Sequence, residues 1–397
     1  MNNSAGSDYT ISGSGSIGDS GFIGGTSLTK SGTGTLTLST ANAYAGPTNV
    51  QQGLLKVGVS GALPQATQLI LGSGANSGAV DLNGFDTTVG GISSAGTATA
   101  NVIGNSSSTP ITLTVTNSSG VFNGAIRDGF NGAPAGGTIA LTVQGGTLTL
   151  AGDNTYTGQT SVAQNATLQI GNGGAAGAIG NTFINVDGTL IFNSSGNINV
   201  ANTVGGAGAL QQIGTGTTTL AADSFYAGLT TISAGTLQVG NGAFAGSIGG
   251  GGPITDNALL AYNRSDDFTL ANVISGTGAV EQRGTGTITM NTAQAYSGGT
   301  RVNAGTVRIT AVNAGGTGTL TVNPGGTLVS GVAALTNPIT LAGGTFGAIN
   351  GLGSITNAAL TAAPGTTSTV YLTDPQNLTL NSDLVFNGIG SIRVWCQ

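Results

Sequence analysis

Hydrophobic and polar residues alternate in short segments along the chain, and glycine-rich turns separate the segments. Thr35 to Leu38 reads Thr-Leu-Thr-Leu, and the same alternation returns at Thr147 to Leu150 and at Thr287 to Met290. Alternation with a period of two predicts a β-strand that buries one face and exposes the other. We therefore expect Leu, Ile and Met to face a core and the β-branched Thr to face outward.

These strands belong to a repeat that occurs four times. Each copy begins with glycine, threonine and an alternating strand, crosses a polar stretch to Tyr-x-Gly, and ends with a second alternating strand. The four copies span 32–58, 145–171, 214–240 and 284–310. The second strands are expected at 50–57, 162–170, 232–239 and 302–309. A fixed period of this length is typical of repeat architectures.

One tyrosine and one glycine mark the same place in every copy. They are Tyr44, Tyr156, Tyr226 and Tyr296, followed two residues later by Gly46, Gly158, Gly228 and Gly298. The last two tyrosine intervals are both 70 residues, and the first is 112, or one period and an insertion of 42. We expect the tyrosine to pack or clamp a turn, with a glycan-stacking platform as the alternative. The glycines are expected where a turn needs positive φ or close backbone approach.

Short strands repeated at a long period fit a propeller, a sandwich or a solenoid. The regular intervals and the low charge favour a parallel solenoid, in which each coil stacks on the last at about 4.8 Å. The sequence therefore predicts an all-β fold, a single parallel β-helix built from degenerate repeats of about 70 residues. Each repeat would contain about three coils of about 20 to 25 residues.

The repeat pattern extends from one end of the chain to the other. Residues 1–31 read as a partial first repeat, and 311–397 read as degenerate repeats with a truncated end. We therefore expect one continuous β-helical array over 1–397. The last residues, 393–397, contain the only Trp and the only Cys and depart from the preceding composition, which indicates a truncation or a reading-frame artefact.

Composition removes several classes of function. The 397 residues include no His, which excludes His-based acid–base and nucleophilic catalysis and the commonest transition-metal ligand. A single cysteine, Cys396, allows neither an internal disulfide nor a thiolate cluster. Charged residues make up 6% of the chain and the net charge is −6, which argues against nucleic acid as a partner. We identify no cofactor or metal motif and no apolar stretch that predicts a membrane-spanning helix.

The repeats resemble the autotransporter-associated β-strand repeat of type V secreted passengers in Gram-negative bacteria. The resemblance rests on Gly120 to Val162 and Ser27 to Gly46, and it extends over nearly the whole chain. It implies a right-handed parallel β-helix, exported through the periplasm and displayed outside the cell by a C-terminal outer-membrane β-barrel. It also implies an adhesin, an aggregation factor or a stalk that helps the passenger to fold. The chain shows neither a signal peptide nor a barrel, so we expect an internal passenger fragment.

Two places carry charges that a catalytic site would need, because β-helical polysaccharide lyases and hydrolases use clustered or paired carboxylates. The denser cluster contains Asp256, Arg264, Asp266 and Asp267. We expect a solvated loop at a coil corner, with a partner-contact patch or a catalytic carboxylate pair as alternatives. The second place, Arg127-Asp128, is interpreted as a structural turn.

The sequence thus predicts a non-enzymatic segment of a surface-displayed passenger that uses no cofactor. Its expected partners are a host or neighbouring-cell surface, through glycan or protein, or further copies of itself. Adhesion, auto-aggregation and biofilm formation are the expected activities. Two alternatives stay open: a carbohydrate-active β-helix, such as a polysaccharide lyase, hydrolase or phage tailspike-like depolymerase, and a purely structural spacer.

Overall fold

The secondary structure consists of parallel β-strands stacked coil upon coil. The computed structural model describes residues 1–4, 6–19, 25–97, 99–130, 137–180, 183–332, 335–348, 354–355, 359–372, 379–380, 384–386 and 391–396. Every helix or strand assigned in these residues is a strand, and the ladders between strands are parallel. This confirms the predicted all-β parallel solenoid. No helix that could cross a membrane occurs in the described part of the chain.

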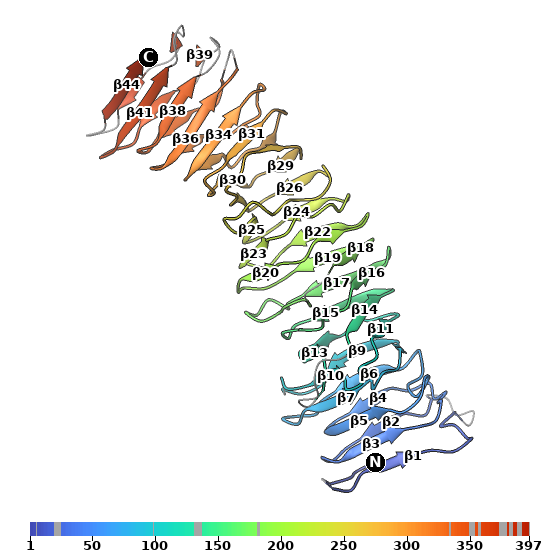
Figure 1. The fold of residues 1–397 in the computed structure, drawn as a ribbon. Coiled ribbons are helices and arrows are strands. Elements are labelled where there is room, and N and C mark those ends of the chain that lie inside the picture. The colour runs from blue at the N-terminus through green and yellow to red at the C-terminus, as the bar shows by residue number, and fades with distance from the viewer. Residues whose placement is uncertain are drawn as a thin grey trace. The chain divides into compact units, whose positions relative to one another are not determined.

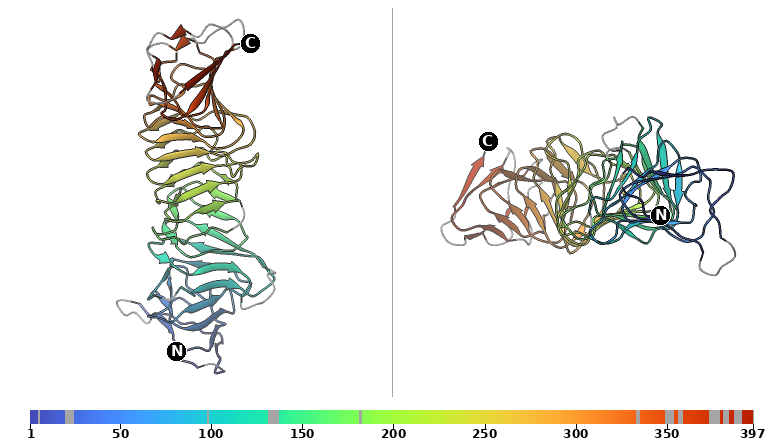
Figure 2. Two further views of the ribbon diagram at one scale, coloured as in Figure 1. Left: turned by 90° about the vertical axis from the view of Figure 1, so that its left-hand side faces the viewer. Right: turned by 90° about the horizontal axis from the view of Figure 1, so that it is seen from below.

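The chain divides into two compact units, Met1–Leu210 and Gln211–Gln397. The first two motif copies lie in the first unit and the last two in the second. Within each unit the strands follow one another in successive layers (Figures 1 and 2). The expectation of one continuous array over 1–397 stays a prediction. Gln397 lies outside the described residues, as do the side chains of Trp395 and Cys396.

The first unit contains four strand series, each in ladder order. One series is β1 (Tyr9–Ile11), β3 (Thr35–Leu38), β5 (Gly53–Val57), β7 (Gly78–Asp81), β10 (Val102–Asn105) and β13 (Ala125–Asp128). The second is β2 (Leu28–Lys30), β4 (Thr48–Val50), β6 (Gln68–Leu71) and β9 (Gly91–Ser94). The third is β8 (Thr87–Val89), β11 (Ile111–Val115), β14 (Ile139–Val143), β16 (Thr160–Val162), β18 (Ile184–Val186) and β21 (Val204–Gly205). The fourth is β12 (Val121–Phe122), β15 (Gly146–Leu150), β17 (Ala166–Ile170) and β19 (Thr189–Phe192), and β20 (Ile198–Val200) and β22 (Ala209–Gln212) follow in the chain.

The second unit repeats this arrangement. One series is β24 (Thr230–Ile232), β26 (Ile254–Asp256), β29 (Ile274–Gly276) and β32 (Ala295–Tyr296). The longest is β23 (Thr217–Leu220), β25 (Thr236–Val239), β27 (Leu259–Tyr262), β30 (Ala279–Gln282), β33 (Thr300–Val302), β35 (Leu320–Val322), β37 (Ile339–Leu341), β40 (Leu360–Ala362) and β43 (Leu384–Phe386). Another is β28 (Phe268–Leu270), β31 (Thr287–Met290), β34 (Gly305–Ile309), β36 (Gly326–Ser330), β38 (Thr345–Ala348), β41 (Thr367–Leu372) and β44 (Ser391–Cys396), and β39 (Ser354–Ile355) pairs with β42 (Thr379–Leu380).

The core of each unit is a set of apolar ladders, with one buried side chain from each coil. In the first unit one ladder runs through Leu36, Leu55, Val80, Ile103 and Ile126. In the second unit one runs through Ile288, Val307, Leu328, Phe346 and Val370. The outward ladder beside the latter consists of Thr287, Thr306, Thr327, Thr345 and Thr369. Burial of the apolar rows supplies the main stabilising term, and the threonines follow the predicted outward positions.

The strand register shows how one 70-residue repeat is wound. In the second unit Thr218 pairs with Leu237, which pairs with Leu260, which pairs with Val280. Successive coils therefore contain 19, 23 and 20 residues, close to the predicted length. The next copy of the motif begins only on the following strand, β31, in another sheet than β23. One repeat is thus three coils and one strand, so consecutive copies in this unit begin on different faces.

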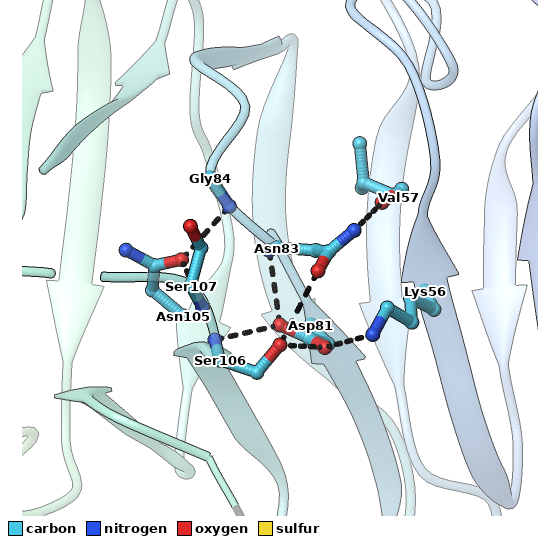
Figure 3. Close-up of polar contacts among 8 residues, drawn as sticks. All are labelled: Lys56, Val57, Asp81, Asn83, Gly84, Asn105, Ser106 and Ser107. Carbon is cyan, nitrogen blue, oxygen red and sulfur yellow. Dashed lines mark hydrogen bonds and ion pairs between the residues drawn. The ribbon is translucent and has the colours of Figure 1, made fainter. Parts of the chain in front are cut away.

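A polar network ties three coils together between the first two motifs (Figure 3). The carboxylate of Asp81 accepts hydrogen bonds from the backbone N–H groups of Asn83 and Ser106, both at 2.9 Å. It also accepts one from the Ser106 hydroxyl at 2.6 Å and lies 3.6 Å from Lys56 Nζ. The Asn83 amide donates to the Val57 carbonyl at 2.9 Å. These bonds satisfy a nearly buried carboxylate and connect β5, β7 and β10.

Candidate functional site

The repeated tyrosine is an interior residue at the corner before the second strand of each motif. Its phenol shares a hydrogen bond with the threonine four residues later in every copy. The oxygen–oxygen distances are 2.6 Å for Tyr44–Thr48, 2.8 Å for Tyr156–Thr160, 2.7 Å for Tyr226–Thr230 and 2.5 Å for Tyr296–Thr300. All eight side chains are at most 1% exposed. Rings buried this deeply leave no face for an external glycan, and the arrangement favours the turn-clamping interpretation.

Burial also fixes the protonation state of these phenols. It raises the pKa of Tyr156 to about 12, against the opposing effect of the hydrogen bond from Thr160. Burial raises the pKa values of Tyr226 and Tyr296 in the same direction, for the same reason. Burial disfavours the charged form of a phenol. The repeated tyrosines are therefore neutral at ordinary pH and have no role as general bases.

The sequence analysis missed two other members of this corner. One is the threonine partner, and the other is the polar residue two positions before the tyrosine, which is Asn42, Asn154, Ser224 or Gln294. Asn154 shows its use: its oxygen accepts from Ile126 N–H at 2.9 Å, and its amide donates to the carbonyls of Gly152 and Ala178 at 2.9 Å each. The signal was present as the common pattern polar-x-Tyr-x-Gly-x-Thr.

A Cβ atom on Gly46, Gly158 or Gly298 would meet the neighbouring backbone. A Cβ atom on Gly158 would lie 2.3 Å from the carbonyl oxygen of Ile139, so close approach requires glycine there. The glycine of the following turn has a second reason, because Gly235 has a φ of +61° and a Cβ atom would lie 2.3 Å from the Gly216 carbonyl oxygen. Close backbone approach and positive φ, the two predicted reasons for these glycines, thus both occur in the motif.

Arg264 is the centre of the predicted charged patch, and its guanidinium group donates to one carboxylate of its own loop and to one carbonyl of the preceding coil. Its Nε and Nη2 donate to the two oxygens of Asp266 at 2.9 and 2.6 Å, and its Nη1 donates to the Gly246 carbonyl at 2.6 Å. The guanidinium carbon also lies 4.9 Å from the centroid of the Phe268 ring. The hydrogen bonds from Arg264 hold the pKa of Asp266 below its usual range. Arg264 is thus a clamp that holds Asp266 of its own loop through a bidentate pair and joins this loop to Gly246 of the preceding coil.

The structure separates Asp256 from the other three residues of the patch. Asp267 is exposed and accepts the backbone N–H of Thr287 at 2.7 Å, whereas Asp256 on β26 is fully buried. Strand parity explains the difference, because Thr255 faces outward and its neighbour Asp256 must face the core. The signal was available in the repeat: one period earlier Val186, an apolar residue, stands at this position.

Most described aspartates accept a backbone N–H group from the next coil. The acceptor and donor residues are 20 to 29 positions apart: Asp8 and Thr35, Asp19 and Ala45, Asp81 and Ser106, Asp86 and Thr112, Asp128 and Thr157, Asp153 and Gly177, Asp187 and Ala207, Asp223 and Gly246, and Asp267 and Thr287. A carboxylate in this role joins two coils, which favours a structural use of the acids. No group of three potential metal-ligating side chains occurs among the described residues.

Neither of two cavities in the described residues gathers paired carboxylates. One of about 410 Å³ in the first unit is lined by Asn123, Asp153 and Asn172 among others. One of about 210 Å³ beside Arg264 has a mainly apolar lining that includes Tyr262 and Phe268. Glycoside hydrolysis generally uses two carboxyl groups about 5 to 10 Å apart. The lining of each of these cavities contains at most one.

Comparison with known families identifies the repeat. The passenger-associated-transport-repeat family matches the chain at 28–57, 144–170, 210–239 and 280–309. The chain contains four passenger-associated-transport-repeats. Each matched segment includes one buried Tyr–Thr pair, so the passenger repeat coincides with the corner described above. The match confirms the resemblance to autotransporter passenger repeats.

Two larger proteins are similar to the chain over part of their length. The adhesin BmaC autotransporter of Brucella suis biovar 1 (strain 1330) is 30% identical over 350 residues, which cover 72% of this chain and 10% of that protein. The uncharacterized lipoprotein YdeK of Escherichia coli (strain K12) is 30% identical over 275 residues, which cover 67% of this chain and 18% of that protein. The chain thus spans less than a fifth of either relative. No solved structure matches it.

Proposed function

We propose that the chain is a segment of a surface-displayed autotransporter passenger and acts without catalysis in adhesion, auto-aggregation or biofilm formation. The four passenger repeats and the relative named as an adhesin support this proposal. Its place would be outside the cell, at the outer membrane surface. Its partner would be a host or neighbouring-cell surface, contacted through glycan or protein, or another copy of the chain.

Exposed apolar side chains in the third repeat are the observation that favours adhesion over a plain spacer. Phe225, Leu229, Phe244 and Val273 are 58, 42, 74 and 46% exposed. The equivalent positions of the preceding repeat hold Thr155, Gln159, Ala175 and Thr203. The repeat fold accommodates polar or small residues at these positions, so the large apolar groups are not required for folding. Exposed apolar patches are typical of surfaces that contact other molecules.

Two of these side chains belong to one continuous row. Thr230 pairs with Ile254, and Ile254 pairs with Ile274. The residues directly before them, Leu229, Pro253 and Val273, therefore follow one another at the N-terminal ends of β24, β26 and β29. The backbone bonds from Thr230 N–H to Pro253 and from Ile254 N–H to Val273, at 3.0 and 2.9 Å, fix this order. Three apolar side chains about 4.8 Å apart form a strip that extends a contact along the coils.

The use of the carboxylates supports the non-enzymatic part of the proposal. In the charged cluster Asp266 is bound by Arg264, and Asp267 accepts a backbone N–H of the next coil. A catalytic acid or base must instead reach a substrate. The release of reducing ends from any of a broad panel of polysaccharides by the purified chain would contradict this part.

The adhesive part is tested by replacing three of the exposed apolar side chains of the third repeat. Leu229→Gln, Phe244→Ala and Val273→Thr introduce the residues of the preceding repeat. Beads that carry equal amounts of chain are counted on host-cell layers, on bacteria and on surfaces coated with the same chain. We expect the triple variant to adhere several-fold less than the unmodified chain. A matched control, Thr321→Ser with Thr340→Ser on outward positions, should adhere normally. Equal adhesion of all beads, at the level of an inert protein, would leave only the spacer role.

A further inference from the structure

Asp256 has a buried carboxyl group that takes no part in the Arg264 clamp or in the aspartate bonds to the next coil described above. It lies on β26 between β24 and β29 and is fully buried. Its Oδ1 accepts the backbone N–H of Ala258 at 3.0 Å, whereas its Oδ2 has no hydrogen-bond partner among the described residues. The backbone of Gly278 packs directly on it, because a Cβ atom there would lie 2.4 Å from the carboxyl carbon. The carboxyl is therefore enclosed by protein.

Two further buried polar atoms of the same coils lack partners. The Tyr262 hydroxyl on β27 and the Gln282 Oε1 on β30 have no hydrogen bond in the described part of the chain, and both side chains are at most 2% exposed. The two residues are direct neighbours in the ladder between β27 and β30. Unpartnered buried polar groups cost free energy, so a group of three in one segment calls for a physical reason.

The preceding repeat shows that the fold does not need this polar group. One period earlier Val186 replaces Asp256 and Phe192 replaces Tyr262, and both are buried. The strands pair alike, since Thr160, Ile184 and Val204 align in the first unit as Thr230, Ile254 and Ile274 do in the second. The third repeat has thus placed a titratable group where an apolar side chain suffices for the fold.

The surroundings of Asp256 oppose its ionisation. Burial raises the pKa of Asp256 from 3.8 to about 6, although the N–H groups of Ala258 and Leu260 act in the other direction. In the unfolded chain the pKa returns to its ordinary value. The folded chain therefore binds one more proton than the unfolded chain between about pH 4 and pH 6.

The groups that face this carboxyl from the neighbouring elements do not compensate its charge. They are the phenols of Tyr262 on β27 and Tyr296 on β32, and burial raises the pKa of each. The adjacent strands β24 and β29 consist of Thr-Thr-Ile and Ile-Ser-Gly, without titratable side chains. The nearest charged pairs in sequence, Arg264–Asp266 and Glu281–Arg283, are paired with each other and are not fully buried.

We propose that Asp256 is a proton-dependent latch in the core of the second unit, closed in mild acid and weakened at neutral pH. When protonated, the carboxyl is neutral and adds a donor to a segment that holds unpartnered acceptors. When ionised, it is a buried charge without a counter-ion, and the coils from β24 to β29 must open or admit water to solvate it. Stability from this residue is complete below about pH 4 and is lost as the pH rises through about 6. Asp256 would act in this way whether or not the chain is adhesive.

The test compares urea unfolding of the whole chain at pH 4, 5, 6 and 7 with that of Asp256→Asn and Asp256→Val. Hydrogen exchange of peptides from 254–276 assigns the transition to the second unit. Relative to either variant, we expect the unfolding equilibrium constant of the unmodified chain to rise about a hundredfold between pH 4 and pH 7, because the shift is about two pH units. Asp267→Asn removes an exposed carboxylate and should keep the full dependence on pH.

A reciprocal variant and a spectroscopic measurement make the outcome decisive. Val186→Asp with Phe192→Tyr should install a similar pH dependence in the first unit. Infrared spectra of the unmodified chain at pH 5 should contain a buried protonated carboxyl band that disappears near pH 7, and this measurement remains available if a variant does not fold. Parallel unfolding curves for the unmodified chain and Asp256→Asn, or the absence of that band at pH 5, would overturn the proposal.

Discussion

The segments 172–214 and 242–284 are the same piece of solenoid built with different side chains. Their backbone contacts repeat at an interval of 69 or 70 residues. Gly173 N–H donates to the Asn193 carbonyl at 2.8 Å, and Gly242 N–H donates to the Asn263 carbonyl at 2.7 Å. The following corner behaves alike, because the amides of Asn202 and Asn272 each donate to a glycine carbonyl of the previous coil at 2.8 Å. The coil path thus does not depend on the residues that differ.

The variable residues perform equivalent tasks with different chemistry. Ser194 donates from its hydroxyl to the Gly174 carbonyl at 3.0 Å and so closes the loop that precedes it. Arg264, at the same position of the later segment, closes its loop through the Gly246 carbonyl. A charged side chain in this solenoid can therefore take the structural role of a hydroxyl group. The buried Asp256 and the exposed apolar strip have no such structural counterpart in the earlier segment.

A buried lysine in the first unit and two glutamines in the second unit make equivalent contacts with different chemistry. Lys30 is fully buried, and its ammonium group donates to the carbonyls of Ser31, Gly32 and Gln52 at 3.1, 2.7 and 3.0 Å. Burial lowers the pKa of this group. Gln212 and Gln282 stand before the same Gly-Thr-Gly turn in the second unit, and their amides donate to the carbonyls of its glycines. An ammonium and an amide therefore cap the same turn.

The Tyr–Thr corner should produce the largest loss, because it is common to all copies. We expect Tyr156→Ala or Tyr226→Ala to lower the free energy of unfolding of its unit by about 3–5 kcal/mol, through the cavity left in the core. Tyr156→Phe should cost about 1–2 kcal/mol, since it leaves the buried Thr160 hydroxyl without its partner. Urea unfolding measures both. A small loss in one copy and a large loss in another would break the equivalence of the repeats.

Replacement of Lys30, which caps the Gly-Thr-Gly turn at 32–34, should have an intermediate effect on the free energy of unfolding. Lys30→Gln introduces the residue of the later copies and should change the free energy of unfolding of the first unit by less than about 1 kcal/mol. Lys30→Leu removes the ammonium donors from three partly buried carbonyls and should cost about 2–3 kcal/mol. Thermal and urea unfolding distinguish the two. If both variants are equally unstable, the ammonium group has a role that an amide does not fill.

Replacement of Arg264, the clamp of the charged patch, should have the smallest effect on the free energy of unfolding. Arg264→Ser introduces the residue of the preceding segment and should leave the free energy of unfolding within about 0.5–1 kcal/mol of the unmodified chain. The same change should raise the pKa of Asp266 toward its usual range, which a carboxyl-detected NMR titration measures. Since the clamp lowers that pKa, its contribution is present at neutral pH and is lost on acidification, opposite to Asp256. An unchanged Asp266 titration would contradict the clamp.

Much of the fold could be predicted because the relevant signals are local. Alternation of Thr and Leu fixes which side of a strand is buried, and the fourfold motif fixes the repeat architecture. The three coils and one strand of a period depend on loop lengths that the pattern does not encode. Asp256 was placed on the surface because its charge was considered before its strand parity. The Thr partner of each Tyr was visible in the sequence but appears as ordinary turn composition until the hydrogen bond is seen.

A chimera in which 215–284 is replaced by the sequence of 145–214 tests whether the repeat backbone is a common scaffold and whether the proposed adhesion depends on exposed side chains of the third repeat. We predict an unchanged far-ultraviolet circular dichroism spectrum, cooperative unfolding as in the unmodified chain, and bead adhesion reduced to the level of an inert protein. A folded chimera that adheres as well as the unmodified chain would contradict the proposed dependence.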